Sequence, residues 1–252
     1  MTITELMSKL AEADAIEDAW AMHTEKMDEY GFDRLIYGYT RFRTGATLGD
    51  LQDALILTNH DPEYVDIFVG EGMYFKGPMV AWAAENVGAC SWRVILEQMQ
   101  SGKLGTDEME AMAVNARMEV TAGYTISFHD VSLRAKGAIG MTARRGLTQA
   151  DVDAIWAEHG ADIELVNKVM HLKVTQLPHT TGQRRKLTKR QREVLEWVAD
   201  GKTIQDTATI MGLNPATVEK HLRLARESLD VDTTAQAILK ASSQNQFFLI
   251  ER

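Results

Sequence analysis

Cysteine is almost absent from this sequence, since Cys90 is the only one among 252 residues. A single cysteine excludes an internal disulfide and leaves no cysteine cluster for a zinc or iron–sulfur site. The sequence therefore predicts neither a metal site nor a cofactor, and it is typical of a protein from a reducing cytoplasm.

Long apolar runs are missing as well. No stretch approaches the roughly 18 consecutive apolar residues that a membrane-spanning helix needs. The N-terminal stretch MTITELMSKLAEADAIEDAW spreads acidic residues among its apolar positions, whereas an export signal has a basic start followed by an apolar block. We therefore expect no export signal, no membrane span and a cytoplasmic location. The composition, with 45% hydrophobic and 25% charged residues, is ordinary for a globular chain of one or two domains.

Acidic and basic residues are segregated along the chain. Residues 181–252 carry 12 Lys/Arg and 9 Asp/Glu, whereas residues 1–180 carry 15 Lys/Arg and 27 Asp/Glu. This asymmetry suggests a part that faces nucleic acid, attached to a part with another task. Between them, Pro178 and Gly182 interrupt the periodic pattern before the chain turns basic. The sequence thus predicts a first domain over 1–175, a linker over 176–186 and a second domain over 187–252.

The first domain is expected to alternate helices with a few strands. Its pattern predicts strands at 32–39, 124–131 and 137–144, the last two as a hairpin, with a loop or frayed edge at 40–50 and an apolar segment of open type at 54–59. It predicts helices at 4–30, 62–70, 78–86, 106–119 with Thr106 as cap, and 147–174 with an interruption near Gly160. This order favours an α+β fold, an α/β/α sandwich around an antiparallel sheet.

The second domain is expected to be all-α. Helices are predicted at 187–201 and 203–212, and a third opens with Asn214 as cap and Pro215 at its first position. The third helix repeats apolar residues at i, i+4, i+7 and i+11: Val218, Leu222, Ala225 and Leu229. Two short helices joined by a tight glycine turn, the second of them with a polar face of long side chains, form the helix-turn-helix arrangement.

The polar face of the third helix suits the edges of DNA bases. It carries Ala216, Glu219, Lys220, Arg223 and Arg226, with Thr217 beside them. Arginine can make a bidentate contact to guanine and glutamate can accept from cytosine, whereas Lys220, Lys202 and the Thr203 hydroxyl are expected at phosphates. The alternative is a solvated charged face on a packing helix.

The second domain resembles a known family over about 50 residues. The stretch 187–238 shows an LT-x-R opening, a GKT turn, a TV-x-x-H third helix and an L-x-V-x-T-x-x-QA-x fourth helix. These motifs closely resemble the DNA-binding domain of LuxR-type transcription regulators. The resemblance implies that the third helix enters the major groove and that the fourth helps dimerisation through Ala235, Ile238 and Leu239. Gln191 departs from the family's usual Glu, but an amide can still hydrogen-bond there.

The first domain resembles the acyl-homoserine-lactone-binding domain of quorum-sensing LuxR regulators. In YVDIFVGEGMYFKGPMVAWAAENVGACSW, an aromatic pair four residues apart precedes a dipeptide ending in Pro, with a Trp fifteen residues after the dipeptide's first position. Gly123 opens the central strand much as a family Gly does. The resemblance implies a ligand site formed by Tyr37, His60, Tyr64, Phe68, Gly77, Pro78 and Trp92.

Several residues at the implied ligand contacts differ from the family. The Asp that accepts from the acyl amide is Gly77 here, the lactone-contacting Trp is Tyr64, and Phe68 lacks the family's hydroxyl. Each missing hydrogen bond costs on the order of 1–3 kcal/mol. We therefore expect weak binding of standard acyl-homoserine lactones, and either a more apolar small effector or none. In the alternative interpretation, Tyr64, Phe68, Trp82 and Trp92 are core aromatics that fill the space.

Together the two resemblances imply a homodimeric regulator that binds a double-stranded DNA operator. Two alternatives stay open: a constitutive orphan regulator without effector, and an interaction module that inactivates another regulator by heterodimerisation. A nucleophilic enzyme using Cys90 with His129 and Asp130 is not expected. The thiol lies in the apolar sequence ACSW, and neighbouring residues on a strand point to opposite faces.

Overall fold

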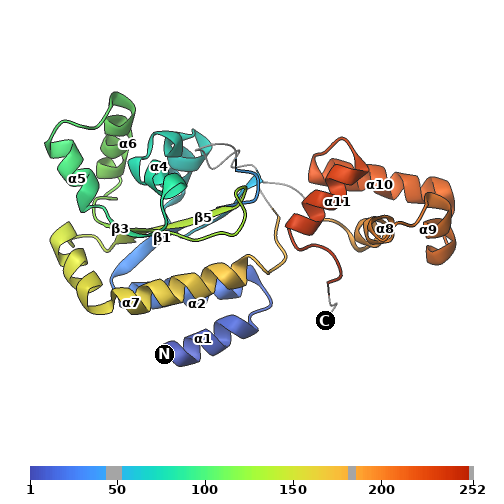
Figure 1. Cartoon of the computed structure of the whole chain (residues 1–252), viewed down its shortest axis with the longest axis horizontal. Coiled ribbons are helices and arrows are strands. Elements are labelled where there is room, and N and C mark those ends of the chain that lie inside the picture. The colour runs from blue at the N-terminus through green and yellow to red at the C-terminus, as the bar shows by residue number, and fades with distance from the viewer. Residues whose placement is uncertain (44–52, 181–185, 250–252) are drawn as a thin grey trace. The chain divides into compact units, whose positions relative to one another are not determined.

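The chain divides into two compact units, residues 1–175 and 176–252 (Figure 1). This computed structural model describes residues 1–43, 53–180 and 186–249. Most of the loop expected at 40–50 and part of the linker expected at 176–186 lie outside the described residues. Within those residues, no helix has the length and apolarity that crossing a membrane requires.

The first unit contains a five-stranded sheet whose neighbouring strands are all antiparallel. Its order is β2-β1-β5-β4-β3. The strands are β1 (Phe32–Thr40), β2 (Leu55–Thr58), β3 (Gly88–Ser91), β4 (Gly123–Ser127) and β5 (Lys136–Ala143). The expected pairing of the strands near 124–131 and 137–144 is confirmed, because Thr125 pairs with Gly140 and Ile126 with Ile139.

Helices cover both faces of the sheet, which confirms the α/β/α sandwich (Figure 1). One face carries α1 (Ile3–Glu12), α2 (Ile16–Glu29) and α7 (Gln149–Val174). The other carries α4 (Pro78–Glu85), α5 (Arg93–Gln100) and α6 (Thr106–Arg117). Before α4 the chain forms α3 (Pro62–Val65), a π-helical turn (Asp66–Gly70) and a 3-10 turn (Met73–Lys76).

Two sequence expectations about helices of the first unit were wrong, and two elements were missed. The single helix at 4–30 is two helices, because Ala13 leaves the helical conformation with ψ at 133°. One continuous apolar stripe gives no sign of such a break, since both helices bury their apolar side chains against α7. The cap of α6 is Gly105, whose N–H donates to Glu108 Oε2 at 2.8 Å, and not Thr106. The elements β3 and α5 were missed.

Gly160 does not interrupt α7, which runs unbroken for 26 residues. A Cβ atom on Gly160 would lie 2.7 Å from Nε1 of Trp156. The Trp156 ring stacks on Tyr124 with centroids 3.9 Å apart. The glycine therefore makes room for an indole ring that joins α7 to β4.

The second unit consists of four helices around one apolar core. They are α8 (Lys189–Ala199), α9 (Ile204–Met211), α10 (Pro215–Leu229) and α11 (Thr234–Ser243). The four apolar positions expected on the third helix are all buried in this core. Gly212 ends α9 with φ at +64°, the left-handed conformation that glycine favours.

The start of the expected linker is held against the C-terminal tail of the second unit. The backbone N–H of His179 donates to the carbonyl of Gln244 at 3.0 Å, and Gln246 Nε2 donates to the His179 carbonyl at 2.9 Å. Asn245 Nδ2 donates to the Leu177 carbonyl at 3.1 Å. Residues 177–179 are therefore part of a packed structure and do not form a free tether.

Candidate nucleic-acid interface and ligand cavity

The third helix of the second unit begins with a side-chain cap. Asn214 Oδ1 accepts from the backbone N–H of Thr217 at 2.8 Å, and Pro215 takes the first helical position, where no N–H is needed. The sequence thus fixes where α10 starts. The first turn also decides which side chains face outward.

The outward face of α10 brings the expected base-reading residues together. Ala216, Glu219, Lys220 and Arg223 are exposed, and Arg226 is half-buried. These five residues line one shallow groove, completed by Ile204, Leu222 and Thr234. Long polar side chains along a helix edge are what readout in the major groove requires.

The two arginines of this face have different partners. Arg223 forms an ion pair with Glu227 one turn along the same helix, and both side chains are more than half exposed. Such a pair contributes little stability, so the Arg223 guanidinium can exchange it for a base. Arg226 Nη1 instead donates to Thr234 Oγ1 at 3.0 Å, which ties α10 to α11.

Two threonines expected near DNA serve as helix caps or cap partners. Thr203 opens α9, where its hydroxyl donates to Asp206 Oδ2 at 2.7 Å and accepts from the Asp206 backbone N–H at 3.1 Å. The Thr217 hydroxyl donates to Asn214 Oδ1 at 3.0 Å. The Thr203 hydroxyl proton is thus engaged within the cap, and a phosphate contact would have to replace its bond to Asp206. Lys202 next to it is exposed.

Gln191 takes the place of the family's Glu in the cap of α8. Its Oε1 accepts from the Thr188 backbone N–H at 2.8 Å, and its own N–H donates to Thr188 Oγ1 at 3.3 Å. The amide completes this capping box, as the sequence led us to expect.

The residues expected at the dimer interface lie on α11. Ala235 is exposed and Leu239 is 61% exposed, whereas Ile238 packs partly against the core of the unit. Two of the three side chains are therefore accessible to a second copy of the chain.

In the first unit, a cavity of about 140 Å³ lies between the sheet and the helices of one face. Ile36, Thr125 and Ala138 contribute from the sheet, and Met112 and Asn115 contribute from α6. Six of the seven expected ligand residues line it: His60, Tyr64, Phe68, Gly77, Pro78 and Trp92.

Tyr37 does not line the cavity, contrary to expectation. Successive residues of a strand point to opposite faces, so Ile36 and Gly38 face the cavity while Tyr37 faces α7. The Tyr37 ring is fully buried, and its hydroxyl shares a hydrogen bond with His171 Nδ1 at 2.9 Å. It belongs to the core beneath the sheet.

Aromatic side chains line part of the cavity wall, and neighbouring side chains satisfy their polar groups. The rings of His60, Tyr64 and Phe68 stack in series, with centroids 4.5 and 5.2 Å apart. The Tyr64 hydroxyl donates to Asn115 Oδ1 at 3.1 Å, and Trp92 Nε1 donates to Thr125 Oγ1 at 2.9 Å. Burial raises the pKa of Tyr64 well above its usual value. The aromatics thus pack as a core, and a cavity remains beside them.

Two glycines fix the shape of this wall. A Cβ on Gly77 would lie 3.2 Å from the Tyr74 carbonyl oxygen and 3.3 Å from Val80 Cγ2, so the backbone leaves little room for the family's Asp. A Cβ on Gly123 would lie 2.2 Å from the Met141 carbonyl oxygen and 3.0 Å from the Trp92 ring. Because Gly123 has no side chain, the Trp92 ring can pack directly against the backbone of β4.

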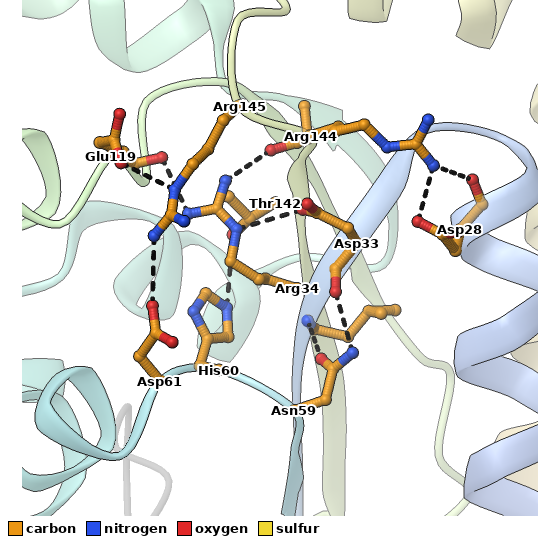
Figure 2. Close-up of polar contacts among 12 residues, drawn as sticks. Asp28, Asp33, Arg34, Asn59, His60, Asp61, Glu119, Thr142, Arg144 and Arg145 are labelled. Atoms are coloured by element: carbon orange, nitrogen blue, oxygen red, sulfur yellow. Dashed lines mark hydrogen bonds and ion pairs between the residues drawn. The ribbon is translucent and has the colours of Figure 1, made fainter.

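Arginines anchor the end of the cavity near His60 (Figure 2). Arg34 is buried and donates to the carbonyls of Glu119 at 3.1 Å and Ala143 at 2.7 Å. Arg145 forms ion pairs with both Asp61 and Glu119. These contacts join the segments next to α3 and α6 to the sheet. Burial, and secondarily the charge of Arg34, lowers the pKa of His60 to about 4.

The sequence reasoning missed several polar residues that line the cavity, among them Asn115, Thr125, Lys136 and Thr142. The alternation along a strand could have found Lys136, because Lys136, Ala138, Gly140 and Thr142 all share the cavity face of β5. The expected strand began one residue too late to include it.

Cys90 has surroundings that suit an inert thiol. It lies on β3, where its Sγ donates to the Ser91 carbonyl at 3.6 Å, and burial raises the pKa of the thiol. His129 is exposed, and Asp130 accepts from the Gly137 backbone N–H at 3.2 Å. Among these three residues the structure records no hydrogen bond that would activate a nucleophile.

Comparison with protein families matches both units. Residues 15–174 match the autoinducer binding domain, and residues 185–241 match the bacterial regulatory proteins of the luxR family. The chain therefore belongs to the LuxR-type quorum-sensing transcription regulators, which pair these two domains. It is a transcription regulator and not an enzyme.

Relatives in this family match the chain over about three quarters of its length. The transcriptional activator CarR of Pectobacterium carotovorum subsp. carotovorum is 21% identical over 76% of this chain and 80% of its own. The quorum sensing-dependent transcriptional regulator RpaR of Rhodopseudomonas palustris is 28% identical over 74% and 73%. The crystal structure of Escherichia coli SdiA has the same fold, with a TM-score of 0.55 at 14% identity over 98% of both chains.

Proposed function

We propose that this regulator acts as a homodimer in the cytoplasm and binds a pseudo-palindromic operator in double-stranded DNA. In this proposal, residues 1–175 sense and dimerise, 176–186 link, and 187–252 bind DNA. The observation that carries it is the exposed face of α10, where Glu219, Lys220 and Arg223 line one groove. Arg223 reads a base, and Lys202 and Lys220 contact phosphates.

A two-fold dimer sets the spacing of the half-sites. Two copies of α10 placed about 34 Å apart reach successive major grooves on one side of the duplex. The exposed Ala235 and Leu239 on α11 supply an apolar strip for the contact between the two copies. Any change in the placement of the two units across the linker alters this spacing.

The cavity of the first unit is proposed to bind a small effector other than a standard acyl-homoserine lactone. Gly77 offers no side-chain acceptor to an acyl amide, and the donors of Tyr64 and Trp92 are already bonded within the wall. The stacked aromatics also keep the constitutive alternative open, because they fill part of the site without any ligand. Mass spectrometry of extracted protein separates the two, since a co-purifying small molecule supports an effector.

The experiment that tests the DNA-binding proposal is a gel shift with full-length protein on the promoter regions of its own genome. Retarded complexes that resist competitor DNA support a sequence-specific regulator. Measuring the mass of the complex, by light scattering or native mass spectrometry, tests the dimer. A monomer that retards no promoter fragment at modest ionic strength contradicts the proposal and favours an interaction module.

A further inference from the structure

Among the described residues that line the cavity of the first unit, Lys136 is the one Lys or Arg. Lys136 opens β5 and lies on its cavity face, and only 5% of the residue is exposed. Its Nζ donates to the carbonyl of Asn86, at the end of α4, at 2.7 Å. An ammonium group has three donors, and this contact uses one.

No acidic side chain balances this charge at close range within the described residues. The residues that line the cavity include neither Asp nor Glu. No carboxylate of a described residue lies within 4 Å of the Lys136 Nζ, and Asp130 acts on it only through a longer-range attraction. Burial, and secondarily the charge of Arg43, lowers the pKa of Lys136. A buried cation without an anion is unfavourable, and a ligand anion would relieve it.

At the other end of the cavity, the nearby arginines are already paired with carboxylates: Arg34 with Asp33, and Arg145 with Asp61 and Glu119. The lining of that end includes His60 and Thr142, whose side chains share a long hydrogen bond of 3.4 Å. With its pKa lowered to about 4, His60 is uncharged at neutral pH. Between the ends the wall is mainly apolar, formed by Ile36, Val69, Val80 and Ala138 among others. The site is therefore apolar along its length with a positive charge at one end.

We propose that the effector of this regulator is an amphipathic monocarboxylate, whose carboxylate pairs with Lys136 while its apolar chain lies along β5 toward His60. The inference rests on the proposed function of the cavity as an effector site. In this proposal Lys136 selects the class of ligand by pairing with a carboxylate. The resemblance to the family implies a different selector, an aspartate that accepts from the ligand's amide N–H and that is Gly77 here. A monoanion matches the single cation, and a charge-assisted hydrogen bond is stronger than a neutral one.

The test compares two ligands with the same acyl chain, sodium decanoate with a charged carboxylate and methyl decanoate with an uncharged ester. Both are titrated by calorimetry into full-length protein and into Lys136→Met, which keeps the length of the side chain without its charge. Lys136→Arg is the control that keeps the charge. Thermal unfolding of each variant without ligand verifies that it is folded.

The expected result is that wild-type protein binds decanoate, that Lys136→Met weakens this binding roughly tenfold or more, and that Lys136→Arg retains most of it. Methyl decanoate should bind both wild type and Lys136→Met with the same affinity. Equal binding of the acid and the ester to wild type, or decanoate binding unchanged in folded Lys136→Met, overturns the proposal. If the ester or a lactone binds and decanoate does not, only the choice of ligand class is wrong. If no apolar compound binds, the proposed effector site fails with it.

Discussion

The Tyr64 hydroxyl donates to Asn115 Oδ1 at 3.1 Å across the cavity of the first unit. The residue at the family's lactone-contacting position is thereby tied to α6. A ligand that accepts from this hydroxyl must first displace the amide. This part of the wall thus satisfies its own polar groups without a ligand.

Standard acyl-homoserine lactones are therefore expected to bind weakly. Each hydrogen bond that the ligand loses on burial costs on the order of 1–3 kcal/mol, a tenfold or greater loss of affinity. Isothermal titration of full-length protein with lactones of several chain lengths measures this. Submicromolar binding of a common lactone contradicts it.

Arg223→Ala is expected to weaken operator binding by roughly 1–3 kcal/mol and to relax sequence specificity. The ion pair with Glu227 is exposed, so its loss should leave the stability of the fold nearly unchanged. Fluorescence anisotropy on operator and scrambled duplexes measures the affinity and the discrimination. Glu227→Ala, which also breaks the pair but keeps Arg223, is the control and should keep discrimination. If Arg223→Ala discriminates as well as wild type, this arginine does not read bases.

Lys202→Ala should weaken binding to all duplexes alike, because a phosphate contact carries no base information. It should also reduce the dependence of log K on log salt by about 0.9, the value for one released counterion. Salt titrations of wild type and variant on specific and scrambled duplexes test this. An effect confined to the specific duplex would assign Lys202 to base recognition.

The free energy of unfolding is expected to fall between pH 7 and pH 5. Burial lowers the pKa of His23, His60 and His171 to about 4, so below about 6.5 the unfolded chain binds protons that the folded chain does not. Each histidine contributes a loss on the order of 1–2 kcal/mol over this range. Urea titrations at both pH values measure it. Replacing His23 by Gln should make the pH dependence shallower, and an unchanged pH dependence in a folded variant would contradict this account.

Gly160→Ala is expected to destabilise the first unit, although the same change in an ordinary helix is stabilising by about 1 kcal/mol. The new methyl group would meet the Trp156 ring, which is fixed by its stack on Tyr124. Thermal unfolding measures the sign. In a Trp156→Ala background the change should become stabilising. A stabilised single variant would show that the ring moves without cost.

The sequence predicted those features that depend on local patterns. Caps, glycine stops and apolar periodicity located the first three helices of the second unit, and alternation located β1, β4 and β5. Features set by tertiary packing were not predictable. The break at Ala13 and the short strand β3 follow from how helices and strands meet, and the unbroken helix at Gly160 follows from a tryptophan ring on the same helix.

The candidate site divides in the same way. The outward face of α10 follows from its helical period, and the structure places these residues on one groove. The ligand residues carried over by resemblance reached the cavity except Tyr37, whose place on the strand turns it toward α7. Neither the partner of Arg226 nor the burial of Lys136 is visible in one sequence, because both depend on elements distant along the chain.

The most direct test of the account is a selection of binding sites from a pool of random duplexes, with full-length wild-type protein and Arg223→Ala in parallel. Wild-type protein should enrich an inverted repeat whose half-sites lie a whole number of duplex turns apart, and the variant should lose preference at one base pair in each half-site. Enrichment of no sequence, or of the same sequence with the same strength by both proteins, contradicts the claim that α10 reads DNA twice in each assembly.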